Sequence, residues 1–112
     1  MADALDQFQI DYRRALHANA KAVADLEEAE EQRKIVFSEE VVAFTQDGTA
    51  IGKAEHMARA SFAYQAASAR VVRCRLAKEE TYGEVESLKT RFETWRSRAA
   101  NARAERMMEG GR

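Results

Sequence analysis

The fold is decided by residues 57–106, which read MARASFAYQAASARVVRCRLAKEETYGEVESLKTRFETWRSRAANARAER. Two sets of positions recur every seven residues in this stretch, and twelve of their fifteen members are apolar. The first set is Met57, Tyr64, Val71, Lys78, Val85, Phe92, Ala99 and Arg106, and the second is Ala60, Ala67, Cys74, Thr81, Leu88, Trp95 and Ala102. A seven-residue repeat of this length predicts a helical seam with left-handed supercoiling.

The segment before this stretch predicts a second helix that is joined to the first by a tight turn. Asp47 and Gly48 form the strongest break in a chain of 112 residues without proline. Gly48 suits the left-handed conformation that ends a helix, and Thr49 suits the cap of the next one. The prediction is a single all-α domain over 1–112, an antiparallel two-helix coiled-coil hairpin. Its first helix covers about 3–46, its turn 47–49 and its second helix about 50–108.

The two helices have a predicted register, in which facing residue numbers add up to about 97. Leu26 then lies near Val71, and Asn19 lies opposite Lys78 as a polar layer that fixes the alignment. A break near Thr81 to Gly83, which would create a third helix, is the alternative. One glycine in a helix costs only about 1 kcal/mol and does not force that break.

Some apolar residues lie off the seam, in the half of each helix nearer the turn. Two helices cannot bury a second stripe, so these residues predict a protein-interaction surface and self-association, with a homodimer favoured, into a helical bundle. The stripe consists of Ile35, Val42, Phe62, Val72 and Leu76.

The charge is unevenly distributed, although the net charge is only −1. Residues 1–69 carry 7 basic and 12 acidic side chains, whereas residues 70–112 carry 11 basic and 7 acidic ones. Four arginines close to the C-terminus are candidate nucleic-acid ligands, because a few arginines give salt-sensitive affinity for phosphates. The alternatives are a solvent-exposed helix end without a ligand and docking on the acidic start of a second subunit. The four are Arg96, Arg98, Arg103 and Arg106.

No group of residues predicts a catalytic, metal or cofactor site. Cys74 is the only cysteine, which excludes an intrachain disulfide, and neither of the two histidines follows a glutamate at the spacing of a di-iron bundle. The glycine spacing before Lys53 does not match a phosphate-binding loop. We therefore expect a protein without enzymatic activity, cofactor or small-molecule substrate. Apolar runs too short for a membrane span predict a location in the cytoplasm.

Residues 49–106 resemble small coiled-coil proteins encoded by phages and prophages. The resemblance is carried by Thr49, by Lys53 to Glu55, by Ala58 to Ser61, by Tyr64, and by the ending Phe92 to Arg96 with Ala99 and Ala102 to Glu105. It implies a setting near phage recombination and replication, in the cytoplasm of a bacterial host cell. The resulting hypothesis is an accessory or inhibitor protein that binds a host or phage protein target. The alternative is a nucleic-acid-binding accessory protein that acts through the C-terminal arginines.

Overall fold

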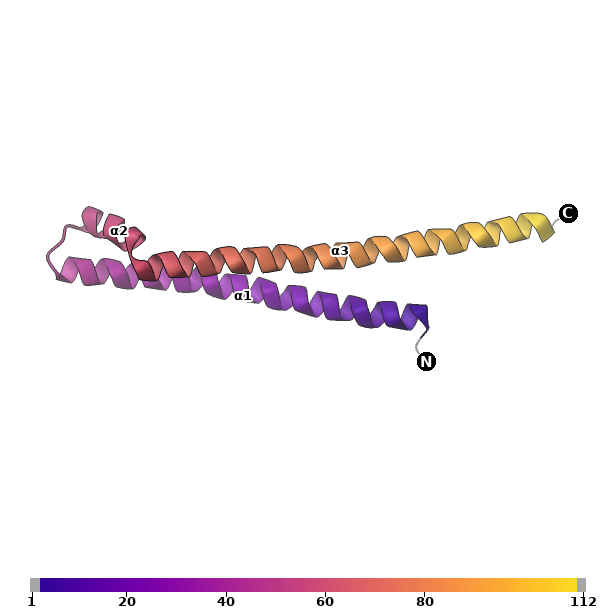
Figure 1. Ribbon diagram of the computed structural model, residues 1–112, viewed down its shortest axis with the longest axis horizontal. Coiled ribbons are helices and arrows are strands. Elements are labelled where there is room, and N and C mark those ends of the chain that lie inside the picture. Colours follow the sequence, from indigo (N-terminus) through magenta and orange to yellow (C-terminus); the bar gives the residue numbers. More distant parts are fainter. Residues whose placement is uncertain (1–2, 111–112) are drawn as a thin grey trace.

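The computed structural model describes residues 3–110 as three helices, with no strand in that range (Figure 1). The helices are α1 (Ala4–Gln46), α2 (Ile51–Ala60) and α3 (Phe62–Gly110). The described part measures 91 × 28 × 14 Å and has a radius of gyration of 25.2 Å. A compact domain of this length would have a radius of gyration of about 13 Å. The prediction of an all-helical, elongated molecule is therefore confirmed, whereas the predicted number of helices is wrong.

Both ends of α1 are capped by local hydrogen bonds. Asp3 precedes the helix, and its side chain accepts a hydrogen bond from the backbone N–H of Asp6 at 2.8 Å. At the other end, Gly48 has a φ of +88°, and its N–H donates to the carbonyl of Thr45 at 3.0 Å. Only glycine adopts such a φ without steric cost. The predicted turn after residue 46 is confirmed.

The predicted second helix is broken at Ser61, which separates α2 from α3. Ser61 has φ −66° and ψ 150°, and its hydroxyl donates to the carbonyl of Ala58 at 2.7 Å. The same oxygen accepts from the N–H of Tyr64 at 3.2 Å, while the Gln65 amide donates to the carbonyl of Arg59 at 2.7 Å. These polar side chains satisfy backbone groups that a helix end leaves unpaired. A continuous helix over 50–108 is therefore the wrong prediction.

No break occurs near Thr81 to Gly83, because α3 runs through this segment. The Thr81 hydroxyl donates within the helix to the carbonyls of Ala77 and Lys78, at 2.9 and 3.0 Å. The break that creates a third helix thus lies at Ser61 and not at Gly83.

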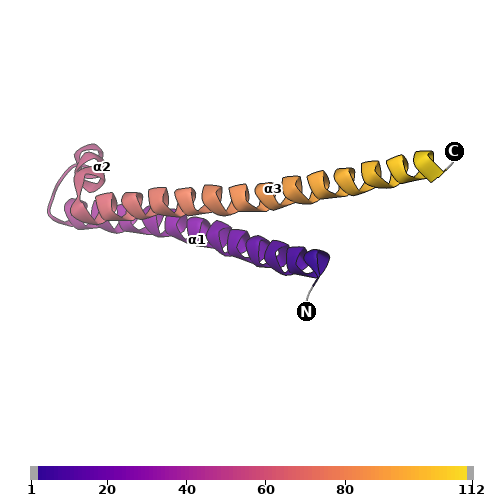
Figure 2. The same cartoon turned by 45° about the vertical axis from the view of Figure 1, so that its right-hand side comes forward.

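α1 and α3 lie side by side over much of their length and run in opposite directions (Figures 1 and 2). Leu26, Ala29 and Val71 form one buried cluster, and Cys74 packs against it. A second cluster joins Ala15 to Val85 and Leu88, with Phe8 and Tyr12 packed against it. Buried and half-buried seam residues thus extend from Tyr64 to Phe92.

A polar layer crosses this interface at Asn19. Its side-chain amide donates to the Thr81 hydroxyl at 3.0 Å and to the backbone carbonyl of Lys78 at 3.3 Å. The predicted neighbour Lys78 takes part through its backbone, and its side chain is exposed. The residue numbers that face each other add up to 97 for Leu26 and Val71 and to 100 for the stacked rings of Phe8 and Phe92.

The close contact on α1 is made by small residues. Ala15, Ala22 and Ala29 are buried and repeat every seven residues, whereas the larger Leu16 beside them is 44% exposed. Small side chains allow two helix backbones to approach each other, so larger residues of α3 pack against this row.

α2 contacts α1 more extensively than it contacts α3. Ala54 and Ala58 are fully buried, and the Arg59 guanidinium lies 5.0 Å from the centre of the Phe37 ring. No helix in the described range is both long and apolar enough to cross a membrane.

Candidate functional surfaces

The five apolar residues of the predicted interaction surface are all exposed. Phe62 is the extreme case, with 90% of its surface exposed, and the other four range from 43% to 54%. Phe62 is the first residue of α3 and directly follows Ser61, whose hydroxyl caps the helix. An exposed aromatic side chain of this size marks an interaction site, because a partner that covers it gains the free energy of burying it.

The five residues do not form one surface. At 3.6 residues per turn, Ile35 and Val42 on α1 lie about 160–180° around the helix from the buried Leu26. On α3, Phe62 and Leu76 lie about 180° and 140° from the buried Val71. Both groups therefore face away from the α1–α3 interface, on opposite sides of the helix pair. The sequence alone could not show this, because it depends on which side of each helix is buried.

The α3 group forms a continuous row, which we call the α3 outer row and define as Phe62, Ala69, Val72 and Leu76. All four are exposed. Their spacings of seven, three and four residues are those of a helix face that packs against another helix. The row covers 14 residue steps, or about 21 Å at 1.5 Å per residue.

The four C-terminal arginines lie on the part of α3 that extends past the start of α1 (Figure 1). All four are exposed, and at 3.6 residues per turn they fall within an arc of about 160°. Within residues 3–110, the ion pairs join Arg70 to Glu28 at 3.5 Å and Lys89 to Glu86 at 3.4 Å. Neither pair involves these arginines, so their charges are available to an acidic partner.

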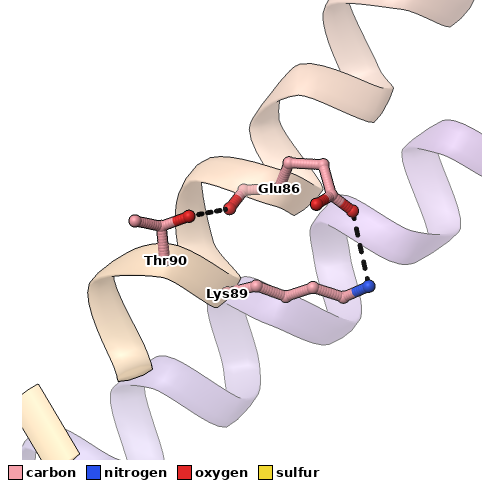
Figure 3. A network of polar contacts seen from close by, with 3 residues as sticks. All are labelled: Glu86, Lys89 and Thr90. Atoms are coloured by element: carbon pink, nitrogen blue, oxygen red, sulfur yellow. Dashed lines mark hydrogen bonds and ion pairs between the residues drawn. The ribbon is translucent and has the colours of Figure 1, made fainter. Parts of the chain in front are cut away.

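Lys89, about two helical turns before Arg96, is already paired with an acidic residue (Figure 3). Its ammonium donates to Glu86, and this hydrogen bond, together with the negative charge of Glu86, raises the pKa of Lys89 above its usual value. The Glu86 backbone carbonyl accepts a further hydrogen bond from the Thr90 hydroxyl at 3.0 Å (Figure 3). The unpaired basic side chains of this end of α3 therefore begin after Lys89.

A groove that the sequence did not predict lies where α1 begins. It has a volume of about 330 Å³ and is mainly apolar. Within it, the Phe8 and Phe92 rings stack at 4.6 Å between centroids, and Phe92 stacks on Trp95 at 5.9 Å. The lining residues are Ala4, Leu5, Gln7, Phe8, Asp11, Leu88, Arg91, Phe92 and Trp95.

Trp95 occupies a seam position but is 52% exposed, because α1 starts at Ala4 and provides no further turn to cover it. A seam position predicts burial against α1, so that prediction is wrong for Trp95. The available signal was the group of aromatic residues in the last heptads, opposite the first residues of α1.

The remaining chemically reactive residues do not gather into a site. Among residues 3–110, no three side chains of His, Cys, Asp or Glu are grouped so that they could hold a metal ion. Cys74 is half-buried beside the Leu26 cluster. The carboxylates of Glu27, Glu28 and Glu31 belong to exposed residues of α1.

Comparisons with known proteins found no matching family model, no similar curated protein and no similar solved structure.

Proposed function

We propose that this chain is a non-enzymatic protein-interaction module, an accessory or inhibitor protein of phage type that works as a homodimer. The phage setting depends only on the resemblance of residues 49–106. The observation that carries the proposal is the α3 outer row, with Phe62 90% exposed at its start. The architecture is an antiparallel coiled-coil hairpin formed by α1 and α3, which pairs with a second hairpin to give a helical bundle.

The α3 outer row is complementary to itself. If two copies of α3 cross in opposite directions about a two-fold axis at Ala69, Phe62 of one copy faces Leu76 of the other. Val72 then faces Ala66 of the other copy, and the two Ala69 side chains meet on the axis. The large residues Phe62 and Leu76 then cover each other at both ends of the contact, and the central alanines allow the two helices to approach closely.

Replacing Phe62 tests the dimer directly. Burying one phenylalanine contributes about 1.5–3 kcal/mol, and a symmetric dimer buries two. Phe62→Asp is therefore expected to weaken dimerisation at least about 100-fold, since each 1.4 kcal/mol is a factor of ten. Helix content should persist, because an aspartate in the first turn of a helix interacts favourably with the helix dipole.

Light scattering measures the mass, and circular dichroism measures the helix content. Leu16→Asp is the matched control, because it introduces the same charge at an exposed apolar residue outside the α3 outer row. A monomeric wild-type protein, or a Phe62→Asp protein with unchanged dimer mass, contradicts the proposal.

The α1 side of the hairpin is the proposed binding surface for the protein target. Ile35 and Val42 stay exposed when the α3 outer rows pair, because they lie on the opposite side of the molecule. The double variant Ile35→Asp, Val42→Asp should remain a dimer and lose the proteins that the wild type retains from a host lysate. Retention of the same proteins by this variant would contradict the assignment.

A second candidate function is nucleic-acid binding by Arg96, Arg98, Arg103 and Arg106, supported by the absence of these arginines from the ion pairs of residues 3–110. Four phosphate contacts predict that affinity falls about 50- to 150-fold between 50 and 200 mM salt. Changing all four to alanine should abolish binding without loss of helix, since alanine has the highest helix propensity. Binding that survives this change contradicts the candidate.

A further inference from the structure

We infer that the groove at the start of α1 accepts an unpaired base of a single-stranded nucleic acid, stacked against Trp95, while its phosphates follow the arginines of α3. The inference rests on the second candidate function and specifies its ligand. Phosphate contacts alone would not distinguish single strands from duplexes, whereas a base-binding groove would.

The groove has the properties that base stacking requires. Its volume of about 330 Å³ lies at the lower end of the range for small-molecule pockets. Trp95 is half exposed and lines this space, and its other contacts include the Phe92 ring at 5.9 Å. Proteins that bind single strands combine aromatic platforms of this kind with a basic surface that follows the backbone.

The arginines continue from the groove along α3. Arg91 lines the groove, and Arg96, Arg98, Arg103 and Arg106 follow on the part of the helix beyond α1. Trp95 and Arg106 are eleven residues apart, or about 16 Å along the axis. This distance corresponds to about five nucleotides at 3.4 Å per stacked nucleotide.

The other wall of the groove determines on which side the phosphates lie. Asp11 lines the groove from α1, and its carboxylate accepts a hydrogen bond from Gln7 at 2.9 Å. Asp3 and Asp6 add negative charge at the start of the same helix, although neither of them lines the groove. Their negative charges disfavour phosphates there, so a single strand fits along α3 and the second strand of a duplex would be repelled.

Trp95 provides the readout, because it is the only tryptophan of the chain. The full-length protein is titrated at about 50 mM salt with labelled oligothymidylate of ~15 nucleotides and with a duplex of the same length, within the range of site sizes for such proteins. Tryptophan fluorescence and the anisotropy of the label are both recorded. The single strand should quench Trp95 and bind at least tenfold more tightly than the duplex.

Three variants separate stacking from phosphate contacts. Trp95→Ala should weaken single-strand binding about 5- to 150-fold, the effect of losing one stacked base, whereas Trp95→Phe should preserve most of it. The change of all four arginines to alanine should abolish binding of both nucleic acids. Circular dichroism verifies that each variant retains its helices.

The outcomes distinguish this inference from the candidate on which it rests. Binding that requires the arginines but leaves Trp95 fluorescence unchanged, or that is equal for single strand and duplex, overturns the inference and retains the candidate. No binding of either nucleic acid at low salt overturns both, and the groove would then be an apolar contact site for a protein.

Discussion

Leu88→Ala tests whether the α1–α3 interface stabilises the molecule. Leu88 is buried in the cluster with Ala15 and Val85, and it also lines the groove. Removing three carbon atoms costs about 2.4 kcal/mol of transfer free energy at 0.8 kcal/mol each. The residual cavity adds about 24 cal/mol per Å³, an addition that stays small here because the neighbouring groove is open to solvent. The expected loss of unfolding free energy is therefore about 2.5–3.5 kcal/mol.

Urea denaturation followed by circular dichroism measures this loss, at the same protein concentration for every variant. Leu16→Ala is the matched control, because Leu16 carries the same side chain on α1 and is exposed. It should cost about 1 kcal/mol or less, since exposed substitutions have small effects. A loss below 1 kcal/mol for Leu88→Ala, or equal losses for both variants, would refute the assignment of Leu88 to the core.

Three further predictions concern stability, one for the polar layer and one for each of two glycines. In a double-mutant cycle with Asn19→Ala and Thr81→Val, the coupling energy should be about 1 kcal/mol, as for one part-buried hydrogen bond; independent effects would mean that the layer does not form. Gly83→Ala should stabilise the protein by about 0.5–1 kcal/mol, because nothing lies within 4 Å of the added Cβ and alanine favours the helix. Gly48→Ala should instead destabilise the protein by about 1–2 kcal/mol, because its φ of +88° strains any side chain. Thermal or urea unfolding measures both variants, and changes in unfolding free energy of the same sign for the two would contradict these predictions.

The sequence predicted the seam well where the heptad pattern and the tertiary packing agree. Val71, Val85 and Leu88 are buried as the pattern required, and Asn19 meets α3 in the predicted polar layer. The alanine row of α1 was overlooked, because a search for large apolar residues gives little weight to alanine.

Ser61 shows why the helix break was missed. The heptad pattern continues through this residue, and neither proline nor glycine marks the site. Serine differs from alanine by only about half a kcal/mol in helix propensity, so tertiary contacts decide. Here the burial of Ala54 and Ala58, together with the hydrogen bonds of Ser61, offsets the loss of helix continuity.

The candidate surfaces were predictable only in part. The sequence identified the five exposed apolar residues and the four arginines, because these residues are far from the seam or beyond it. It did not show that Ile35 and Val42 lie on the opposite side of the molecule from the α3 outer row. The side of each helix that faces its neighbour is determined by packing between the helices. The groove lined by Trp95 depends on where α1 starts relative to α3. A local sequence pattern does not predict this relative placement.

A symmetric cross-link at Ala69 tests the proposed homodimer most directly. In a Cys74→Ser background, Ala69→Cys places one thiol on each side of the proposed two-fold axis, within reach of a disulfide. Under mild oxidation this 12.6 kDa chain should form a covalent dimer, whereas Ala77→Cys on the same helix should not. The account is contradicted if the Ala69→Cys chain stays monomeric, or if both variants cross-link equally.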